Sequence, residues 1–404
     1  MQNLTKEDIK SDPLFKTFLR SRNIKEKTIQ IHETRLTLYC NYLKKFPTEL
    51  IEEAEEESVG VKMRSRKIVG YFLDYTEYLE EKKLSHRTIK GYMATVKAFY
   101  NHYEIVLPKD VANNKIIENP ASHVLPTMAE IKKVLDLATV RDKSIILLHL
   151  SSAMGAAELR SLRYSHFVDA VKDEIDINDP MDIEEVALKV LEKKDIIGKW
   201  DIRRIKTGRY YTTFSSPECM HAIANYLLDR IKTNKTIATL DSALYTSHSN
   251  DELGETSHFL IFERLNDRAG LGFRTEKRRL FTSHQLRRVF ASELTKVHVD
   301  NNAVELLSGR KITGVRGSYV RLDVKWLKEE YLKGVKAVSI EKLEVRRMET
   351  EDVKKLEALK SSELENQRRI SQLEQELQEQ KQTGKRLEGM VQSFLKDQLE
   401  KDVK

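Results

Sequence analysis

Cysteine is scarce in this chain of 404 residues, which contains only Cys40 and Cys219. The two lie far apart and show no CxxC spacing. They therefore predict neither a disulfide framework nor a cysteine zinc site, and they suit a reducing compartment.

Long hydrophobic runs are lacking as well. The longest nearly apolar stretch, residues 145–157, is interrupted by His149 and two serines and is too short to span a bilayer. The first ten residues are polar and charged, unlike a signal peptide. We therefore expect a cytoplasmic protein without a membrane partner.

Positive charge, by contrast, is in excess: the net charge is +7 and the pI is near 9. Residues 341–404 are slightly acidic, so residues 1–340 carry +8. Binding to a phosphate backbone needs such an excess. Many proteins that never contact DNA are equally basic, so charge alone does not decide the partner.

Apolar residues recur at helical spacing in three segments of the first hundred residues. They are Leu36, Tyr39 and Leu43; Ile68, Phe72, Tyr75 and Leu79; and Ile89, Met93, Val96, Phe99 and Tyr103. Ser85 is a favourable N-cap for the third segment. Residues 109–126 hold prolines and paired asparagines without periodicity, which is typical of a linker. The pattern predicts a helical domain over residues 1–108, followed by a linker over residues 109–126.

A second domain is expected over residues 127–340. Residues 128–138 and 143–162 have helical patterns, and the stretch from residue 218 into the 330s is again mostly helical. Between residues 200 and 214, aromatic and β-branched residues flank Thr207-Gly208, which predicts a β-hairpin.

The tail, residues 341–404, changes character. With Leu356 at heptad position a, eight of the twelve a and d positions up to Phe394 are apolar. This predicts a coiled coil and self-association through residues 345–404. A single exposed amphipathic helix fits the pattern equally well, and Gly384 and Gly389 favour a break.

Two basic motifs precede that tail. Residues 283–291 read SHQLRRVFA and residues 306–310 read LLSGR, and Tyr319 follows Arg310 by nine residues. Each residue alone has an ordinary explanation: a solvated helix face for Arg287 and Arg288, or a helix cap for His284. Tyr319 could be an ordinary half-buried aromatic residue, and Arg310 could be a partner in an ion pair.

Taken together, the motifs resemble those of tyrosine recombinases, the superfamily of Xer, Cre and phage integrases. The N-terminal domain is most similar to archaeal-type integrases. The family carries an H-x-x-R box, an L-L-G-H box and a nucleophilic tyrosine nine residues past the second histidine. The resemblance makes His284 and Arg287 the first box, puts Arg310 in place of the second histidine, and makes Tyr319 the nucleophile, with Tyr331 as a rival. Lys206, beside the Thr207-Gly208 turn, matches a catalytic lysine that the family carries on a hairpin.

The resemblance covers roughly residues 12–335 and implies a mainly α fold. Its parts are a helical, SAM-like core-binding domain, a mixed catalytic domain with a small β-sheet, and a coiled-coil-like C-terminal helix. It implies site-specific cleavage and rejoining of double-stranded DNA through a 3′-phosphotyrosine, by a homo-tetramer and a Holliday junction. No metal and no cofactor are expected. DNA contacts are expected from Arg87, Lys90 and Arg288, in a nucleoid-associated protein.

The chemistry itself supports these residue types. Attack on a phosphodiester builds negative charge on non-bridging oxygens, and the forked guanidinium of arginine matches that charge. A tyrosine hydroxyl has a pKa near 10 and needs a nearby base or cations, a role that His284 could fill. Lys206 could donate a proton to the departing 5′ oxygen.

One part of the family pattern is absent. The first catalytic arginine belongs to a G-x-R-x-x-E-L box, which reads AMGAAEL at residues 153–159. Glu158 and Leu159 match, but Gly155 holds the place of the arginine, and neighbouring Ala156 is not arginine either. Arg160 is expected to point elsewhere on its helix.

Two explanations of this absence stay open. The natural protein lacks the arginine, or an engineered arginine-to-alanine exchange at position 156 removed it. We therefore expect a recombinase with impaired activity. The alternative is a catalytically weak or inactive DNA-binding or architectural protein with the same fold. A type IB topoisomerase shares the chemistry, but the helical N-terminal domain argues against it.

Overall fold

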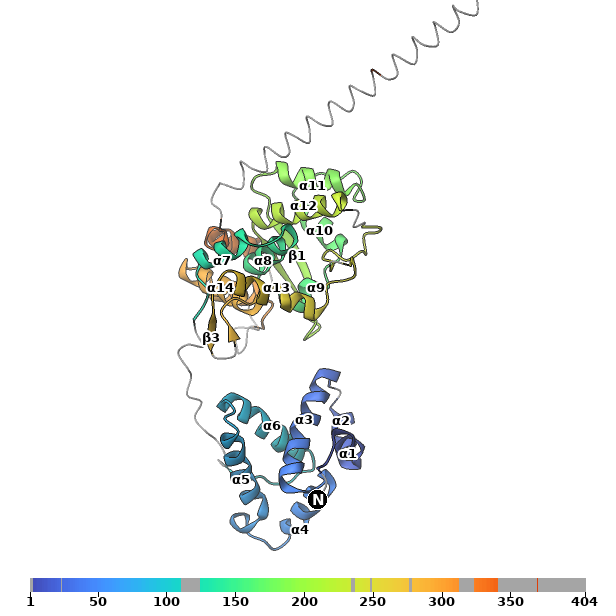
Figure 1. Ribbon diagram of the computed structural model, residues 1–404, viewed down its shortest axis with the longest axis vertical. Helices are drawn as coiled ribbons and strands as arrows, with labels where there is room; N and C mark the ends of the chain where they lie inside the picture. The colour runs from blue at the N-terminus through green and yellow to red at the C-terminus, as the bar shows by residue number, and fades with distance from the viewer. Residues whose placement is uncertain are drawn as a thin grey trace, which may run out of the picture. The chain divides into compact units, whose positions relative to one another are not determined.

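The computed structural model describes residues 3–22, 24–109, 124–233, 237–247, 249–275, 278–311, 323–340 and 369. The chain divides into two compact units, Met1–Ser122 and His123–Lys404 (Figure 1). Tyr319, most of the predicted linker over residues 109–126 and nearly all of the predicted coiled coil lie outside the described residues.

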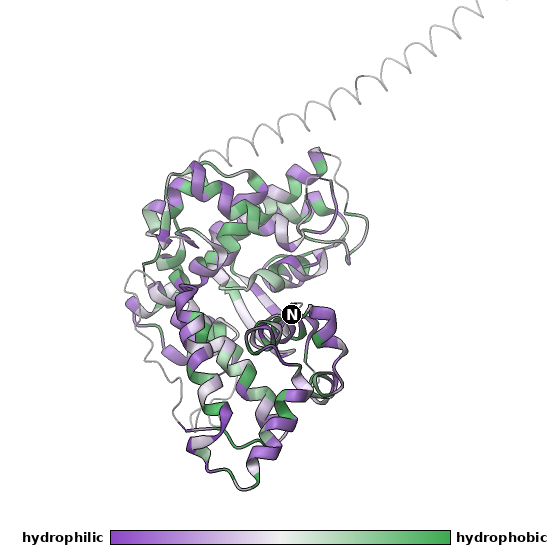
Figure 2. Ribbon diagram, turned by 60° about the horizontal axis from the view of Figure 1, so that its bottom comes forward, coloured by the Kyte–Doolittle hydropathy of each residue, from purple (hydrophilic) through white to green (hydrophobic). Residues whose placement is uncertain are grey.

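Unit 1, blue in Figure 1, has helices as its regular elements and no strand in its described part. Its helices are α1 (Lys6–Ser11), α2 (Pro13–Ser21), α3 (Glu26–Leu43), α4 (Pro47–Ser58), η1 (Met63–Ser65), α5 (Lys67–Glu81) and α6 (His86–His102). The predicted apolar stripes of α3, α5 and α6 are largely buried in one core. Ser85 caps α6 as predicted, because its side chain accepts a hydrogen bond from the Thr88 backbone N–H at 3.3 Å. Figure 2 shows hydrophobic and hydrophilic residues interleaved along most helices, as expected when each helix buries one face.

Unit 2 combines helices with two small antiparallel sheets. Its elements are α7 (Met128–Asp136), α8 (Val140–Ser152), α9 (Ala156–Arg160), α10 (Tyr164–Val171), α11 (Ile183–Glu192), β1 (Gly198–Arg203), β2 (Tyr210–Ser215), α12 (Pro217–Lys232), α13 (Glu255–Arg268), β3 (Phe273–Thr275), β4 (Arg278–Arg279), α14 (Ser283–Lys296), α15 (Asn301–Leu307), α17 (Val324–Gly334) and η3 (Val335–Val338). The apolar helix α8 is almost wholly buried and packs against α12 and α14. The mainly α fold with a small β component is confirmed.

The predicted single helix over residues 143–162 is wrong. Helix α8 ends at Ser152 because Ala153 adopts a left-handed conformation (φ 52°), and α9 begins only at Ala156. The side chain of Ser152 accepts from the Met154 N–H at 3.3 Å and stabilises the turn. In the short loop between the helices, the carbonyl of the buried Ala153 accepts a hydrogen bond from α14, as described below.

The predicted β-hairpin is confirmed. Strands β1 and β2 pair antiparallel from Gly198↔Ser215 to Arg203↔Tyr210. Gly208 has a φ of +72°, which glycine adopts without strain, and its N–H donates to the Arg204 carbonyl at 2.7 Å. A second hairpin, β3–β4, lies within the stretch that was expected to be mostly helical.

Within the described residues, no helix combines the length and the apolar character needed to cross a membrane.

Candidate active site

Helix α14 brings the residues of the first basic motif onto one face. Thr282, rather than His284, caps the helix, because its side chain accepts from the Gln285 N–H at 3.3 Å. His284, Arg287 and Arg288 are spaced three and four residues apart and therefore neighbour one another. Arg287 is only 9% exposed, so the explanation as a solvated helix face is wrong for it.

Arg287 joins two loops that are distant in sequence. Its Nη1 donates to the Ala153 carbonyl at 2.6 Å, and its Nη2 donates to the Ser308 carbonyl. Three of its five N–H donors are not used in these bonds. Burial and the charges of Arg204 and Arg310 lower the pKa of Arg287, although a guanidinium stays charged at neutral pH.

The second basic motif ends helix α15 in a Schellman motif. The Gly309 N–H donates to the Leu306 carbonyl at 2.7 Å and the Arg310 N–H to the Glu305 carbonyl at 2.9 Å. Glycine is required at residue 309, because φ is +62° and a Cβ would lie 3.0 Å from the ring of Tyr211. The side chain of Arg310 pairs with Glu305 at 2.9 Å, so its ordinary explanation as an ion-pair partner also applies.

His284 is exposed at the surface, and four arginines act on it electrostatically. Partial burial, followed by the charges of Arg288, Arg287, Arg310 and Arg274, lowers the pKa of its imidazole. The ring is therefore neutral at pH 7 and able to accept a proton. Arg274, on β3, was not predicted from the sequence.

The β1–β2 hairpin carries a second cation, Arg204, besides the predicted Lys206. Lys206 is exposed in the turn and makes no hydrogen bond or ion pair with the described residues. Arg204 is partly buried, and its Nη1 donates to the Gly309 carbonyl of the second motif. The only sequence signal for Arg204 is its place on the same hairpin, two residues before Lys206.

The box at residues 153–159, which lacks its arginine, forms the loop after α8 and the start of α9. Gly155 is the N-cap residue of α9, and a Cβ there would lie 2.2 Å from Oε2 of Glu158. Ala156 is partly buried at the start of the helix. The guanidinium of Arg160 lies 4.0 Å from the carboxylate of Glu255 on α13.

Tyr331, the rival to Tyr319, has a structural position. Its side chain is fully buried, its hydroxyl donates to the Ser151 carbonyl at 3.0 Å, and its ring lies 5.5 Å from that of Phe214. Burial raises the pKa of Tyr331 far above its usual value. This hydroxyl is therefore not placed to attack an external substrate.

The residues predicted to contact DNA are accessible. Arg87 and Lys90 are exposed on α6, and Arg288 is half-buried on α14. Among the described residues, no group of three or more histidine, cysteine, aspartate or glutamate side chains could hold a metal ion.

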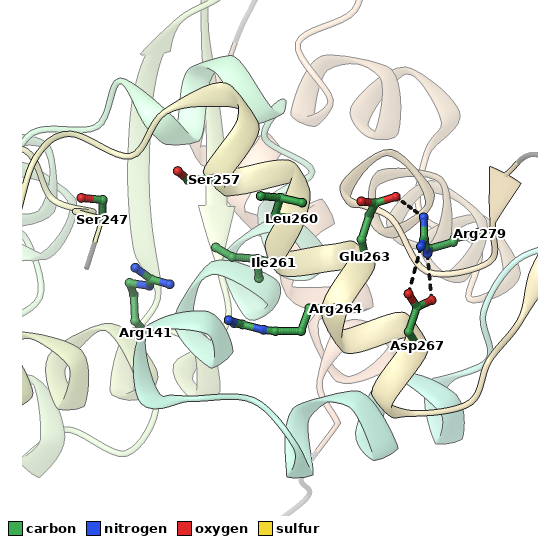
Figure 3. Close-up of a pocket in the computed structure, with 9 residues that line it drawn as sticks. All are labelled: Arg141, Ser247, Ser257, Leu260, Ile261, Glu263, Arg264, Asp267 and Arg279. Atoms are coloured by element: carbon green, nitrogen blue, oxygen red, sulfur yellow. Dashed lines mark hydrogen bonds and ion pairs between the residues drawn. The ribbon is translucent and has the colours of Figure 1, made fainter. Parts of the chain in front are cut away.

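A cavity of about 500 Å³ lies beside α13 (Figure 3). Its arginines are engaged by carboxylates: Arg264 contacts Asp142 at 2.6 Å, and Arg279 contacts Asp267 at 2.8 Å and also Glu263. None of the predicted site residues lines it. We therefore place the candidate site at the guanidinium groups around His284.

Comparison with known proteins supplies the family. Residues 121–325 match the family described as Phage integrase family, which is about half of the chain. No curated protein matches. Among solved structures, the chain is similar to XerA recombinase (18% identity, TM-score 0.35, covering 79% of this chain and 96% of that one). It is also similar to the Tn1549 transposon integrase in complex with transposon right end DNA (17%, 0.45, 79% and 98%). A lambda integrase dimer bound to a core site is a third similar structure (15%, 0.46, 76% and 97%). The chain belongs to the phage integrase family of tyrosine recombinases.

Proposed function

We propose that this protein is a site-specific DNA recombinase that cuts and rejoins duplex DNA through a 3′-phosphotyrosine at Tyr319. The observation that carries the proposal is the group of guanidinium side chains around a neutral imidazole in a member of this family. Fixed cations of this kind match the charge that develops on a phosphodiester under attack.

The proposed reaction uses side chains alone. The Tyr319 hydroxyl oxygen attacks the phosphorus, and its proton passes to His284. Arg287 and Arg310 stabilise the charge on the non-bridging oxygens. The bond from phosphorus to the 5′ oxygen breaks, and Lys206 donates a proton to that oxygen. Rejoining reverses these steps, and it needs no nucleotide because the phosphotyrosine bond keeps the energy of the broken one.

DNA contacts outside the reacting centre are assigned to Arg87, Lys90 and Arg288. Phosphate contacts release counterions, so we expect binding to fall steeply as salt rises. Gel shifts of one duplex at 50 mM and 200 mM salt (about a fourfold range) test this expectation. Salt-independent binding, or no binding to any duplex, would remove the proposal.

A second candidate function is a non-catalytic DNA-binding or architectural role. Gly155 favours it, because the family's first arginine is missing there. A suicide DNA substrate distinguishes the two: covalent attachment supports the recombinase, and tight binding without attachment supports the architectural protein.

Assembly is the remaining part of the proposal. We assign a homo-tetramer on two DNA sites, with residues 345–404 contributing to self-association. Deleting these residues should weaken association in sedimentation and spare cleavage, since every proposed catalytic residue precedes them. An unchanged sedimentation profile would reduce the tail to a solvated helix.

A further inference from the structure

The β1–β2 hairpin contacts the start of α9, where residue 155 lacks an arginine; we call this region the α9 corner. Glu158, the retained acidic residue of this box, accepts the Ile205 N–H at 3.2 Å. The other oxygen of the same carboxylate lies against Gly155, in the space that a side chain there would need. The hairpin turn is thereby fastened directly to the incomplete box.

This attachment brings a second guanidinium beside Arg287. The carbonyls of Ser308 and Gly309 are consecutive, and each accepts from an arginine: Ser308 from Arg287 and Gly309 from Arg204. Neither arginine has a carboxylate partner within ion-pair distance among the described residues. Two neighbouring, partly buried like charges repel each other, and an anion between them would relieve that repulsion.

A buried hydroxyl beside these arginines also lacks a partner. Tyr211 is 8% exposed, and its hydroxyl makes no hydrogen bond with the described residues. Its ring packs on Gly309, and it interacts electrostatically with Arg287, Arg204 and Glu158. A buried hydroxyl without a partner is unfavourable, so a ligand that offers an acceptor there would be stabilised.

We propose that Arg204 supplies the second guanidinium of the phosphate site, in place of the arginine absent from residue 155, with the Tyr211 hydroxyl as a further donor. The inference rests on the proposed function and extends it to a catalytic residue. In this arrangement, Arg287 of α14 and Arg204 of the hairpin are held at consecutive carbonyls of the loop after α15, and both contact the phosphate. Arg204 of the hairpin thus takes the role of the arginine missing from the start of α9.

The test compares Arg204→Ala with Arg203→Ala. Arg203 is the adjacent residue and is exposed. Its side chain donates to the Gly208 carbonyl at 3.4 Å, within the hairpin, and not to the loop after α15. Both variants therefore lose one positive charge and one contact with a carbonyl. The substrate is the duplex that the protein selects from a random-sequence pool. Single-turnover cleavage should slow by roughly a hundred- to a thousandfold in Arg204→Ala, as for loss of one transition-state donor. Arg203→Ala should stay within about twofold.

A methylphosphonate at the cleaved position separates direct contact from a structural role. That linkage has no anionic oxygen to neutralise, so the two variants should cleave it at similar rates. An equal loss on both substrates would mean that Arg204 acts only by holding Gly309, and would overturn the inference. An equal loss in Arg203→Ala and Arg204→Ala would overturn it as well.

Binding of orthovanadate, followed by calorimetry, tests the inference without cleavage. Wild type and Arg203→Ala should bind it alike, and Arg204→Ala should bind at least tenfold more weakly (roughly one charge-assisted contact). If no variant cleaves DNA and this difference persists, the recombinase proposal fails and the anion site stands. If wild type cleaves and neither cleavage nor orthovanadate binding depends on Arg204, the recombinase proposal stands and the inference fails.

Discussion

The two arginine positions of the site are built differently. At α14 the arginine is present, and Arg287 also ties the end of α8 to the loop after α15 through two carbonyls. At α9 the position holds Gly155, yet the helix start and Glu158 remain. An arginine that also holds the fold together cannot be lost without destabilising it. On the proposal above, an arginine at residue 155 would serve only the phosphate, and a cation from another element could replace it.

The largest expected effect comes from Arg287→Ala. Cleavage should fall by roughly a hundred- to a thousandfold, because a transition-state donor is lost. The free energy of unfolding should fall too, by about 1–3 kcal/mol for each carbonyl left without a partner. Single-turnover cleavage and urea unfolding measure the two losses. A loss of cleavage with an unchanged free energy of unfolding would show that Arg287 does not also stabilise the fold, and the contrast with residue 155 would fail.

The second prediction restores an arginine at the start of α9, at residue 155 or 156. In the Arg204→Ala background, Gly155→Arg or Ala156→Arg should raise cleavage at least about tenfold, by restoring a donor. The gain should be smaller where Arg204 is present, since both guanidinium groups would serve one phosphate. Position 155 also requires the Glu158 carboxylate to move, so the two variants are measured separately. Equal gains in both backgrounds would show that Arg204 does not replace the arginine missing from residue 155.

Acid should affect the α9 corner through a buried histidine pair. Nδ1 of His149 lies 2.9 Å from the Met154 carbonyl, and its Nε2 lies 2.9 Å from Nε2 of His258. A carbonyl only accepts, so His149 carries its proton on Nδ1 and His258 donates to the other nitrogen. Burial lowers the pKa of His149 to about 4 and that of His258 to about 3.

The sign of the pH dependence follows from these two values. In the unfolded chain each histidine titrates near its usual pKa of about 6.5, so between that pH and about 4 the unfolded state binds more protons. Stability is therefore full above pH 6.5 and falls as pH falls, by up to about 1.4 kcal/mol per pH unit for each histidine. Urea unfolding at pH 7, 6 and 5 should show this slope, and His258→Gln should make it shallower. An identical slope in the variant would remove the pair as its cause.

What the sequence could predict is mostly local. The cap at Ser85, the β1–β2 hairpin and the apolar stripes each depend on residues a few positions apart. The break after α8 depends on contacts across the loop between α8 and α9, which no periodicity reveals. The position of Arg204 depends on a carbonyl 105 residues later in the chain, and that distance hides it from any local pattern. Arg274 likewise acts on His284 through space, and no local pattern in the sequence reveals this interaction.

The most direct test of the proposed function is to trap the protein on a suicide DNA substrate and map the attached peptide. The expected phosphopeptide contains Tyr319. Tyr319→Phe should abolish attachment with DNA affinity nearly unchanged, since only a hydroxyl is lost, whereas Tyr331→Phe should still attach. A phosphopeptide that contains Tyr331, or attachment that survives Tyr319→Phe, would contradict the assignment of Tyr319 as the nucleophile.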